Sequence, residues 1–193
     1  MEFYLPPYKI FSMKALIING HKYYRYSKGK LNRTLFDEII RVLSLKHEVE
    51  TTVISQGYDI GEEQEKFLRS DVIIYQTPVN WYSIPWILKK YIDDVYTHGV
   101  FFESSVDYGR GGILTGKKYM LSLTMSAPEE SFSTNSGFFD GRDIDDIFIP
   151  FHKTQEYCGM ERIKTFAVYN VLRNTDIETF KVNLALHLNK YIG

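Results

Sequence analysis

Short apolar runs alternate with amphipathic runs along this whole sequence, and that alternation constrains the fold more than any other feature. The apolar runs predict strands at residues 15–18, 49–54, 72–76, 119–124 and 165–169. The amphipathic runs have apolar residues at helical spacing and predict helices at 31–45, 62–70, 86–96, 144–158 and 176–191. Strict alternation of strand and helix indicates an α/β fold, a five-stranded parallel sheet with helices on both faces. The strand order 2-1-3-4-5 is expected, with the ligand crevice beside strands 1 and 3.

Size and composition limit the classes of protein that this chain can represent. With 193 residues, it suits one domain, which we expect at residues 13–193. Residues 1–12 are interpreted as an N-terminal extension, with a packed N-terminal arm as the alternative. A net charge of −1 argues against a nucleic-acid binder and mildly against an acidic electron carrier. A single cysteine, Cys158, excludes an internal disulfide and favours a cytoplasmic protein, and no apolar run reaches membrane-spanning length.

The segment after the first expected strand, residues 19–34, is long, polar and basic, and it leads into a helix. Backbone N–H groups and the dipole at a helix N-terminus, together with nearby Lys and Arg side chains, favour a phosphate or pyrophosphate. Ser27 and Asn32 add short hydrogen-bonding side chains, and Gly29 permits a close approach of the backbone. A solvated basic loop with Ser27 as a turn residue is the alternative interpretation.

An aromatic loop with two prolines follows the third expected strand, at residues 76–85. Together with the helix start behind it, this loop carries Trp81, Tyr82 and Trp86, which would expose much apolar surface unless they covered something flat. Open α/β sheets bind their ligands outside the carboxyl ends of the strands. The loop is therefore expected to lie against a planar ligand.

Two further regions are expected to be functional. Small residues follow the fourth strand in the run from Thr124 to Pro128, and they would let backbone N–H groups face the edge of a ligand, although an ordinary loop exit is the alternative. The connections at residues 97–116 and 125–143 are long, and long loops in compact domains usually carry function.

Several patterns that could suggest other chemistry do not hold. Residues 111–117 have the glycine and lysine spacing of a P-loop, but Lys118 stands where Ser or Thr should bind magnesium, and a strand follows instead of a helix. No G-x-G-x-x-G opens the first helix, and the five histidines have no metal-ligand spacing, so no metal site is expected. The pairs at 93–94 and 145–146 are adjacent aspartates, more typical of solvated helix faces than of an acid/base couple. Cys158 is expected to be a packed thiol.

Seven segments together match a known family. They lie at residues 16–20, 27–34, 85–95, 108–112, 116–124, 150–153 and 159–161. From about Lys14 to the last residues, the chain resembles the bacterial NADPH:quinone reductases called modulator of drug activity B. These form a branch of the flavodoxin-like family that includes DT-diaphorase.

This resemblance implies a flavodoxin-like fold that binds FAD at a homodimer interface and moves hydride from NADPH to a quinone. It assigns pyrophosphate and ribose contacts to Ser27, Gly29, Leu31, Asn32 and Thr34. The loop at the isoalloxazine ring would be Pro78, Val79, Asn80 and Trp81. Tyr108 resembles a flavin-contacting tyrosine that could reach from the other subunit. The segment Thr124, Met125, Ser126 and Ala127 resembles the one whose backbone binds the polar edge of the ring.

The chain departs from the family pattern at a few positions near the substrate face. A Gly-Trp-Trp-like loop is replaced by the sequence from Val79 to Trp81, and Met125 and Ser126 replace Trp and Asn after strand 4. Asp140 stands where a histidine is common. No residue is expected to be a catalytic acid or base, because the cofactor carries the chemistry. The alternatives are an FMN-dependent reductase of flavins, azo or nitro compounds and a non-catalytic flavin-binding electron carrier.

Overall fold

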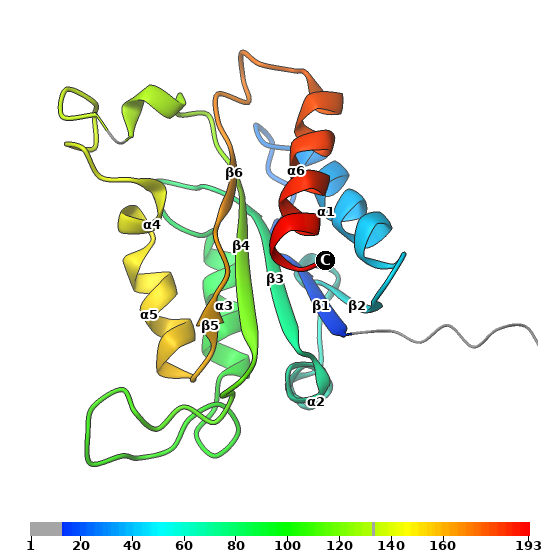
Figure 1. Cartoon of the computed structure of the whole chain (residues 1–193), viewed down its shortest axis with the longest axis vertical. Coiled ribbons are helices and arrows are strands. Elements are labelled where there is room, and N and C mark those ends of the chain that lie inside the picture. Colours follow the sequence, from blue (N-terminus) through cyan, green and yellow to red (C-terminus); the bar gives the residue numbers. More distant parts are fainter. Residues whose placement is uncertain (1–12, 133) are drawn as a thin grey trace, which may run out of the picture.

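One parallel sheet runs through the middle of the protein (Figure 1). The computed structural model describes residues 13–132 and 134–193, and the expectation for residues 1–12 lies outside them. The strands are β1 (Lys14–Asn19), β2 (Glu48–Val53), β3 (Val72–Pro78), β4 (Lys118–Thr124), β5 (Glu161–Arg162) and β6 (Phe166–Val168). Their order is β2-β1-β3-β4-β5, with β6 also paired to β4, and all pairings are parallel. The predicted 2-1-3-4-5 order is confirmed.

Helices cover both faces of this sheet. One face carries α1 (Lys30–Leu43) and α6 (Ile177–Tyr191), and the other carries α2 (Ile60–Arg69), α3 (Trp86–Val95) and α5 (Ile149–Tyr157). The short α4 (Ile144–Ile147) precedes α5. Successive strand residues alternate between the two cores: Ile17 packs under α1 and α6, whereas Leu16 and Ile18 pack under α3 and its neighbours. Because both faces are buried, the central strands are apolar throughout rather than alternating.

Two predicted elements, the helix at 144–158 and the strand at 165–169, differ in detail from the prediction. The helix expected at 144–158 is divided at Phe148, because Pro150 lacks an N–H and its ring would clash with the preceding turn of a continuous helix. The strand expected at 165–169 is present as the shorter β6, and the short strand β5, which was not predicted, precedes it. Tyr119 pairs with Arg162 and Ser122 pairs with Phe166, so the fifth strand uses one residue more than β4 between these pairs. The result is a bulge between β5 and β6.

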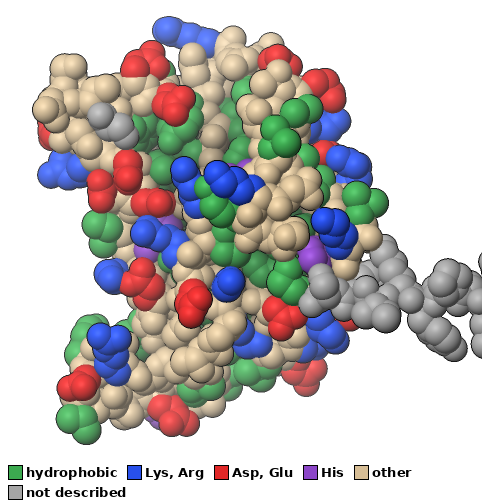
Figure 2. All heavy atoms as spheres, in the orientation of Figure 1, with side chains coloured by type: hydrophobic (Ala, Val, Ile, Leu, Met, Phe, Trp, Pro, Cys, Tyr) green, Lys and Arg blue, Asp and Glu red, His purple; other side chains and the backbone are tan. Residues whose placement is uncertain are grey.

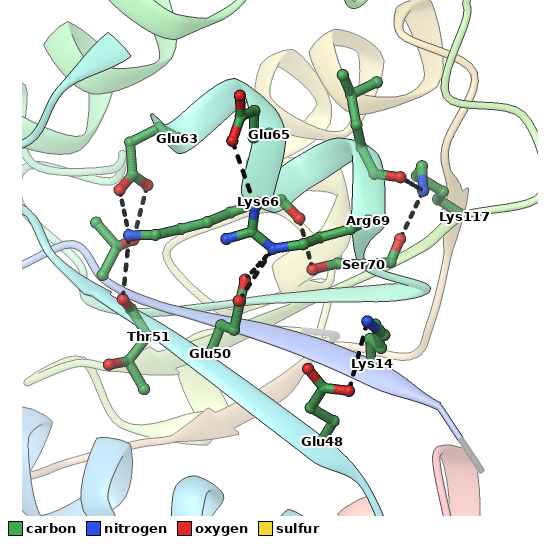
Figure 3. Close-up of polar contacts among 12 residues, drawn as sticks. Lys14, Glu48, Glu50, Thr51, Glu63, Glu65, Lys66, Arg69, Ser70 and Lys117 are labelled. Carbon is green, nitrogen blue, oxygen red and sulfur yellow. Dashed lines mark hydrogen bonds and ion pairs between the residues drawn. The ribbon is translucent and has the colours of Figure 1, made fainter. Parts of the chain in front are cut away.

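Charged side chains protect the free edge of the sheet at β2 (Figure 3). Arg69 pairs with Glu50 at 2.8 Å, and Lys14 pairs with Glu48 at 3.4 Å. Charges on an edge strand discourage pairing with another chain. Behind them, the buried Glu63 accepts hydrogen bonds from Thr52 Oγ1 (2.7 Å) and Tyr91 OH (2.6 Å) and pairs with Lys66 (2.6 Å), which fixes α2 against β2 and α3.

None of the helices in the described part of the chain has the length and apolar character needed to cross a membrane. Nor do residues 13–132 and 134–193 bring three or more His, Cys, Asp or Glu side chains into a group that could hold a metal ion.

Candidate functional site

Two adjoining hollows open at the carboxyl ends of β1, β3, β4 and β6. The first, here called the phosphate-side pocket, has a volume of about 480 Å³ and is lined by residues 26–32, 78–80, 124–126 and 171–172. The second, called the apolar pocket, has a volume of about 260 Å³ and is lined by Val79, Trp81, Tyr82, Met125, Ser126, Ala127, Phe132, Phe139, Ile144, Ile147 and Phe148. Val79, Met125 and Ser126 line both, so the two hollows form one trough.

The basic loop closes one end of this trough and is folded back on a buried histidine. Gly29, with φ 69°, begins helix α1, and a Cβ at this position would lie 2.1 Å from His21 Cε1. Burial lowers the pKa of His21, opposed by a hydrogen bond with the Ser27 backbone. The Nε2 atom of His21 is buried and has no hydrogen-bond partner among the described residues. Only glycine fits at this helix start, because a side chain would need both a left-handed backbone and the space of the imidazole.

A buried chain of amide and hydroxyl groups supports the floor of the trough. Asn32 Nδ2 donates to Asn19 Oδ1 at 2.9 Å, and Gln76 Nε2 donates to Asn32 Oδ1 at 3.0 Å. Ser122 Oγ then donates to Gln76 Oε1 at 2.7 Å. This chain ties the first turn of α1 to the carboxyl ends of β1, β3 and β4. The Asn32 side chain therefore holds the helix start in place, and its side-chain polar groups are already used within the protein.

The aromatic loop forms a tight hairpin at the junction of the two pockets. Asn80 and Ser83 exchange backbone hydrogen bonds of 2.9 and 3.1 Å, and the two residues between them, Trp81 and Tyr82, have φ of 49° and 61°. Two left-handed residues make a type I′ turn, which Asn and Gly normally occupy. Bulky side chains in this conformation are strained, and such strain persists mainly at functional sites. Trp81 is 92 % exposed, so it presents its ring to whatever occupies the trough.

The apolar pocket has aromatic walls and two free backbone donors. Phe132 and Phe139 stack at 4.4 Å between ring centroids, and Tyr82 meets Phe139 edge-on at 5.4 Å. The N–H groups of Ser126 and Ala127, which also line the pocket, donate to no described residue, whereas the Met125 N–H donates to Val168 O. The pocket can therefore hold a planar apolar ring and offer hydrogen bonds to polar atoms at its edge.

Most residues predicted from the sequence meet at this trough. Ten line the phosphate-side pocket: Ser27, Gly29, Leu31, Asn32, Pro78, Val79, Asn80, Thr124, Met125 and Ser126. Trp81 and Ala127 line the apolar pocket. The roles of these residues toward a cofactor stay predictions.

Two predicted residues lie elsewhere. The Thr34 hydroxyl is one turn into α1 and donates to the Lys30 carbonyl at 3.1 Å, and it does not line the trough. Tyr108 is 94 % exposed and lies in the loop that enters the amino end of β4, at the opposite end of the strands, with its ring 5.7 Å from that of Tyr157. Within one chain, Tyr108 therefore cannot reach the trough. The glycine-rich part of this loop packs on the turn after α5, where a Cβ at Gly112 would lie 2.3 Å from Gly159 N.

Sequence reasoning missed several lining residues. Tyr26, Lys28 and Lys30 belong to the basic loop that was identified, and they line the phosphate-side pocket together with Val171 and Leu172. The last two follow β6, and their position at the carboxyl end of a strand was the available signal. Phe132, Phe139, Ile144, Ile147 and Phe148 carry no spacing signal that marks them as pocket residues, since folding of the 125–143 loop brings them together.

Comparisons with known proteins agree with this geometry. A family model described as flavodoxin-like fold matches residues 13–191. NADPH:quinone oxidoreductase MdaB of Haemophilus influenzae is 42 % identical over 192 residues, which cover 94 % of this chain and 100 % of that protein. A solved structure from Klebsiella pneumoniae has a TM-score of 0.76 at 26 % identity, covering 93 % of this chain and 85 % of that chain. General stress protein 14 of Treponema denticola, solved in complex with FMN, shares the fold with a TM-score of 0.73 at 20 % identity, covering 92 % and 98 % of the two chains. The chain therefore belongs to the flavodoxin-like family, in the group of NADPH:quinone oxidoreductase MdaB.

Proposed function

We propose that this protein is an FAD-dependent NADPH:quinone oxidoreductase. The observation that carries the proposal is the single trough with two unlike ends, a basic helix start at one end and an aromatic pocket with free N–H groups at the other. A flavin nucleotide has matching ends, a phosphate chain and a planar ring with a polar edge. The relative MdaB, 42 % identical along nearly the whole chain, is named for this activity.

The phosphate-side pocket fits a diphosphate. Residues 20–36 contain Lys22, Arg25, Lys28, Lys30 and Arg33 and no acidic residue. The loop precedes a 14-residue helix whose N-terminus has no side-chain cap, so its first N–H groups are open to an anion. The five basic side chains of this loop suit two phosphates better than one, which supports FAD over FMN.

The apolar pocket would hold the ring system and its reaction partners. When bound, the flavin would supply the redox chemistry by taking hydride from NADPH and giving two electrons to a quinone. Trp81 would cover the ring, and the N–H groups of Ser126 and Ala127 would stabilise negative charge at its polar edge. Among the described residues, no acidic or basic side chain lines this pocket, so we assign no catalytic acid or base. NADPH and the quinone would occupy the same pocket in turn, which predicts ping-pong kinetics.

A homodimer with two sites at its interface would complete the trough. The exposed ring of Trp81 leaves one side of the site uncovered, and Tyr108 lies on the surface far from its own trough. A C2 pairing would place the 97–116 loop of each subunit over the site of the other and make the two sites equivalent. Covering the ring in this way would exclude water from the reaction. A cytoplasmic location is proposed on the single, buried cysteine.

Two measurements test this function. Flavin released by acid from the purified protein should co-migrate with FAD, and FMN alone would contradict the cofactor assignment. NADPH oxidation with menadione should give parallel double-reciprocal lines when both substrates are varied. An electron carrier would instead fail to turn over menadione with NADPH.

A further inference from the structure

The apolar pocket has two parts with different neighbours. Val79, Met125 and Ser126 also line the phosphate-side pocket, so the flavin ring of the proposed function would lie beside them, under Trp81. Five apolar residues from the 132–148 segment line the apolar pocket only, and the part of the pocket that they line is here called the inner hollow. These residues are Phe132, Phe139, Ile144, Ile147 and Phe148.

The walls of the inner hollow are apolar. Phe132, Phe139 and Phe148 are 4 %, 8 % and 2 % exposed, so their rings belong to the protein core. Ile144 and Ile147 are half-buried and pack against the same core. The side chains of these five described residues offer no hydrogen-bond donor, acceptor or charge. Water in such surroundings has few partners, so an apolar group that displaces it gains affinity.

Contacts within the protein fix the walls of the inner hollow. Phe132 and Phe139 stack with 4.4 Å between their ring centroids. Helix α4, which carries the two isoleucines, begins with a capping box in which Asp146 N–H donates to Asp143 Oδ1 at 2.9 Å and Asp143 N–H donates to Asp146 Oδ2 at 3.1 Å. Figure 2 shows acidic side chains on the outer surface of this segment, at the upper left, with hydrophobic side chains between them. A group that enters the hollow therefore meets preformed walls, and little ordering opposes its binding.

Of the groups expected in the trough, an alkyl chain fits the inner hollow best. The polar edge of a flavin would lie at the N–H groups of Ser126 and Ala127, and the carboxamide of a nicotinamide would find no side-chain partner in the hollow. A quinone has its two oxygens on the ring, whereas a substituent of the ring can extend into the hollow. Burial of each methylene there is favourable, and burial of a hydroxyl or carboxylate without a partner is not.

We propose that the inner hollow binds an alkyl side chain of the electron acceptor, so that the protein selects alkyl-substituted quinones over quinones with polar substituents. This inference rests on the proposed quinone reduction and deepens it by naming the class of quinone. The quinone ring would lie against the flavin, and the chain would lie among the five apolar side chains of the hollow. Binding at both places would orient the ring for reduction.

The kinetic test uses 1,4-naphthoquinones that differ only in the substituent at carbon 2: methyl, propyl, pentyl and 3-hydroxypropyl. With flavin-loaded protein, kcat/KM should rise about fourfold for each methylene that enters the hollow, and the rise should end when the hollow is full. The hydroxypropyl compound should be no better than the methyl compound, because its hydroxyl finds no partner. Equal kcat/KM values along the alkyl series overturn the proposal, and they are the result expected if the flavin ring itself filled the hollow.

Two variants at Ile147 test the position of the chain. Ile147→Phe fills part of the hollow, so the pentyl compound should lose its advantage over the propyl compound. Ile147→Asn adds an amide to the wall, so the ratio of kcat/KM for pentyl over methyl should fall at least about fivefold. The matched controls are Ile177→Phe and Ile177→Asn, because Ile177 is 41 % exposed at the start of α6 and does not line the pocket. An unchanged ratio in the Ile147 variants, or an equal fall in the Ile177 variants, overturns the proposal.

A binding test separates this inference from the proposed function. Calorimetry measures the affinity of the purified, flavin-loaded protein for 2-methyl-, 2-propyl- and 2-pentyl-1-naphthol, which have the naphthalene ring but cannot accept electrons. Affinity should rise with chain length in wild type but not in Ile147→Asn. Binding that is independent of chain length, with normal menadione reduction, refutes the assignment of the inner hollow alone. Binding that rises with chain length, without reduction of any quinone, refutes the proposed function and leaves the assignment of the hollow in place.

Discussion

Gly29 stands directly over the imidazole of His21, where a Cβ would lie 2.1 Å from Cε1. Gly29→Ala therefore requires a left-handed alanine and a displaced, buried histidine. We expect it to lower the free energy of unfolding by at least about 2 kcal/mol, of which the backbone conformation accounts for about 1–2 kcal/mol, and to reduce flavin retention. Urea titration and flavin content are the measurements. Gly116→Ala is the control, since Gly116 has φ 82° but nothing within 4 Å; equal losses in both variants would show that His21 is not involved.

Relieving the backbone strain at Trp81 should stabilise the flavin-free protein and weaken its affinity for flavin. Trp81→Asn puts a residue that tolerates positive φ at the first central position of the type I′ turn. We expect the flavin-free protein to gain about 0.5–1 kcal/mol of stability from relief of this strain. Flavin affinity should fall, because the covering ring is lost. Trp86→Asn, within helix α3, should give no such gain, and a destabilised Trp81→Asn protein would contradict the strain argument.

Within the buried amide chain, a substitution at Asn32, near its centre, should destabilise the protein more than one at Ser122, at its end. Asn32→Ala leaves Gln76 Nε2 without an acceptor and removes one of the two donors to Asn19 Oδ1, which keeps the His21 N–H at 3.2 Å. The cost should be about 2–4 kcal/mol, for one unsatisfied group and one further lost hydrogen bond. Ser122→Ala removes one donor to Gln76 and should cost about 1–2 kcal/mol. Chemical denaturation measures both. The exposed Asn183→Ala should stay within about 0.5 kcal/mol of wild type, and a reversed order at Asn32 and Ser122 would disprove the network.

Tyr108 tests the dimer. Because its side chain is exposed and remote from its own trough, Tyr108→Ala should leave thermal stability of the flavin-free protein unchanged. It should nevertheless weaken flavin retention severalfold if the partner subunit supplies this ring. Val106→Ala, equally exposed in the same loop, should retain flavin. Sedimentation of the loaded protein as a monomer at micromolar concentration would rule out the proposed arrangement.

Asp145 should contribute to acid sensitivity. Its pKa is lowered by hydrogen bonds from His152 and Thr165 and by the charge of Arg162, although burial acts in the opposite direction. A depressed folded-state pKa gives stability that is complete above the unfolded value of about 3.8 and is lost as the pH falls through the folded value. Asp145→Asn should cost about 1–2 kcal/mol at neutral pH, and its gap to wild type should close below about pH 4. Asp93→Asn, which breaks an exposed pair with Lys89, should differ little in stability from wild type at any pH. A stability difference between Asp145→Asn and wild type that does not change with pH would contradict this linkage.

The spacing of apolar residues along the sequence was sufficient to predict the layers of the fold and the strand order. The apolar runs at β1, β3 and β4 are buried on both faces, so their composition alone marks them as central parallel strands. The predicted helix at 144–158 was wrong as one element, although Pro150 was visible in the sequence, because the apolar spacing continues through the break at Phe148.

The sequence by itself determined the sheet and the family, and it located the basic loop and the aromatic loop. These features depend on local spacing and on motifs a few residues long. Only the tertiary structure decided that Tyr108 lies at the far end of the strands, that Asn32 is held by Asn19 and Gln76, and that Phe132, Phe139 and Ile147 line the inner hollow. Those relationships join residues many positions apart. They follow from how loops pack, which the pattern of apolar residues along the chain does not encode.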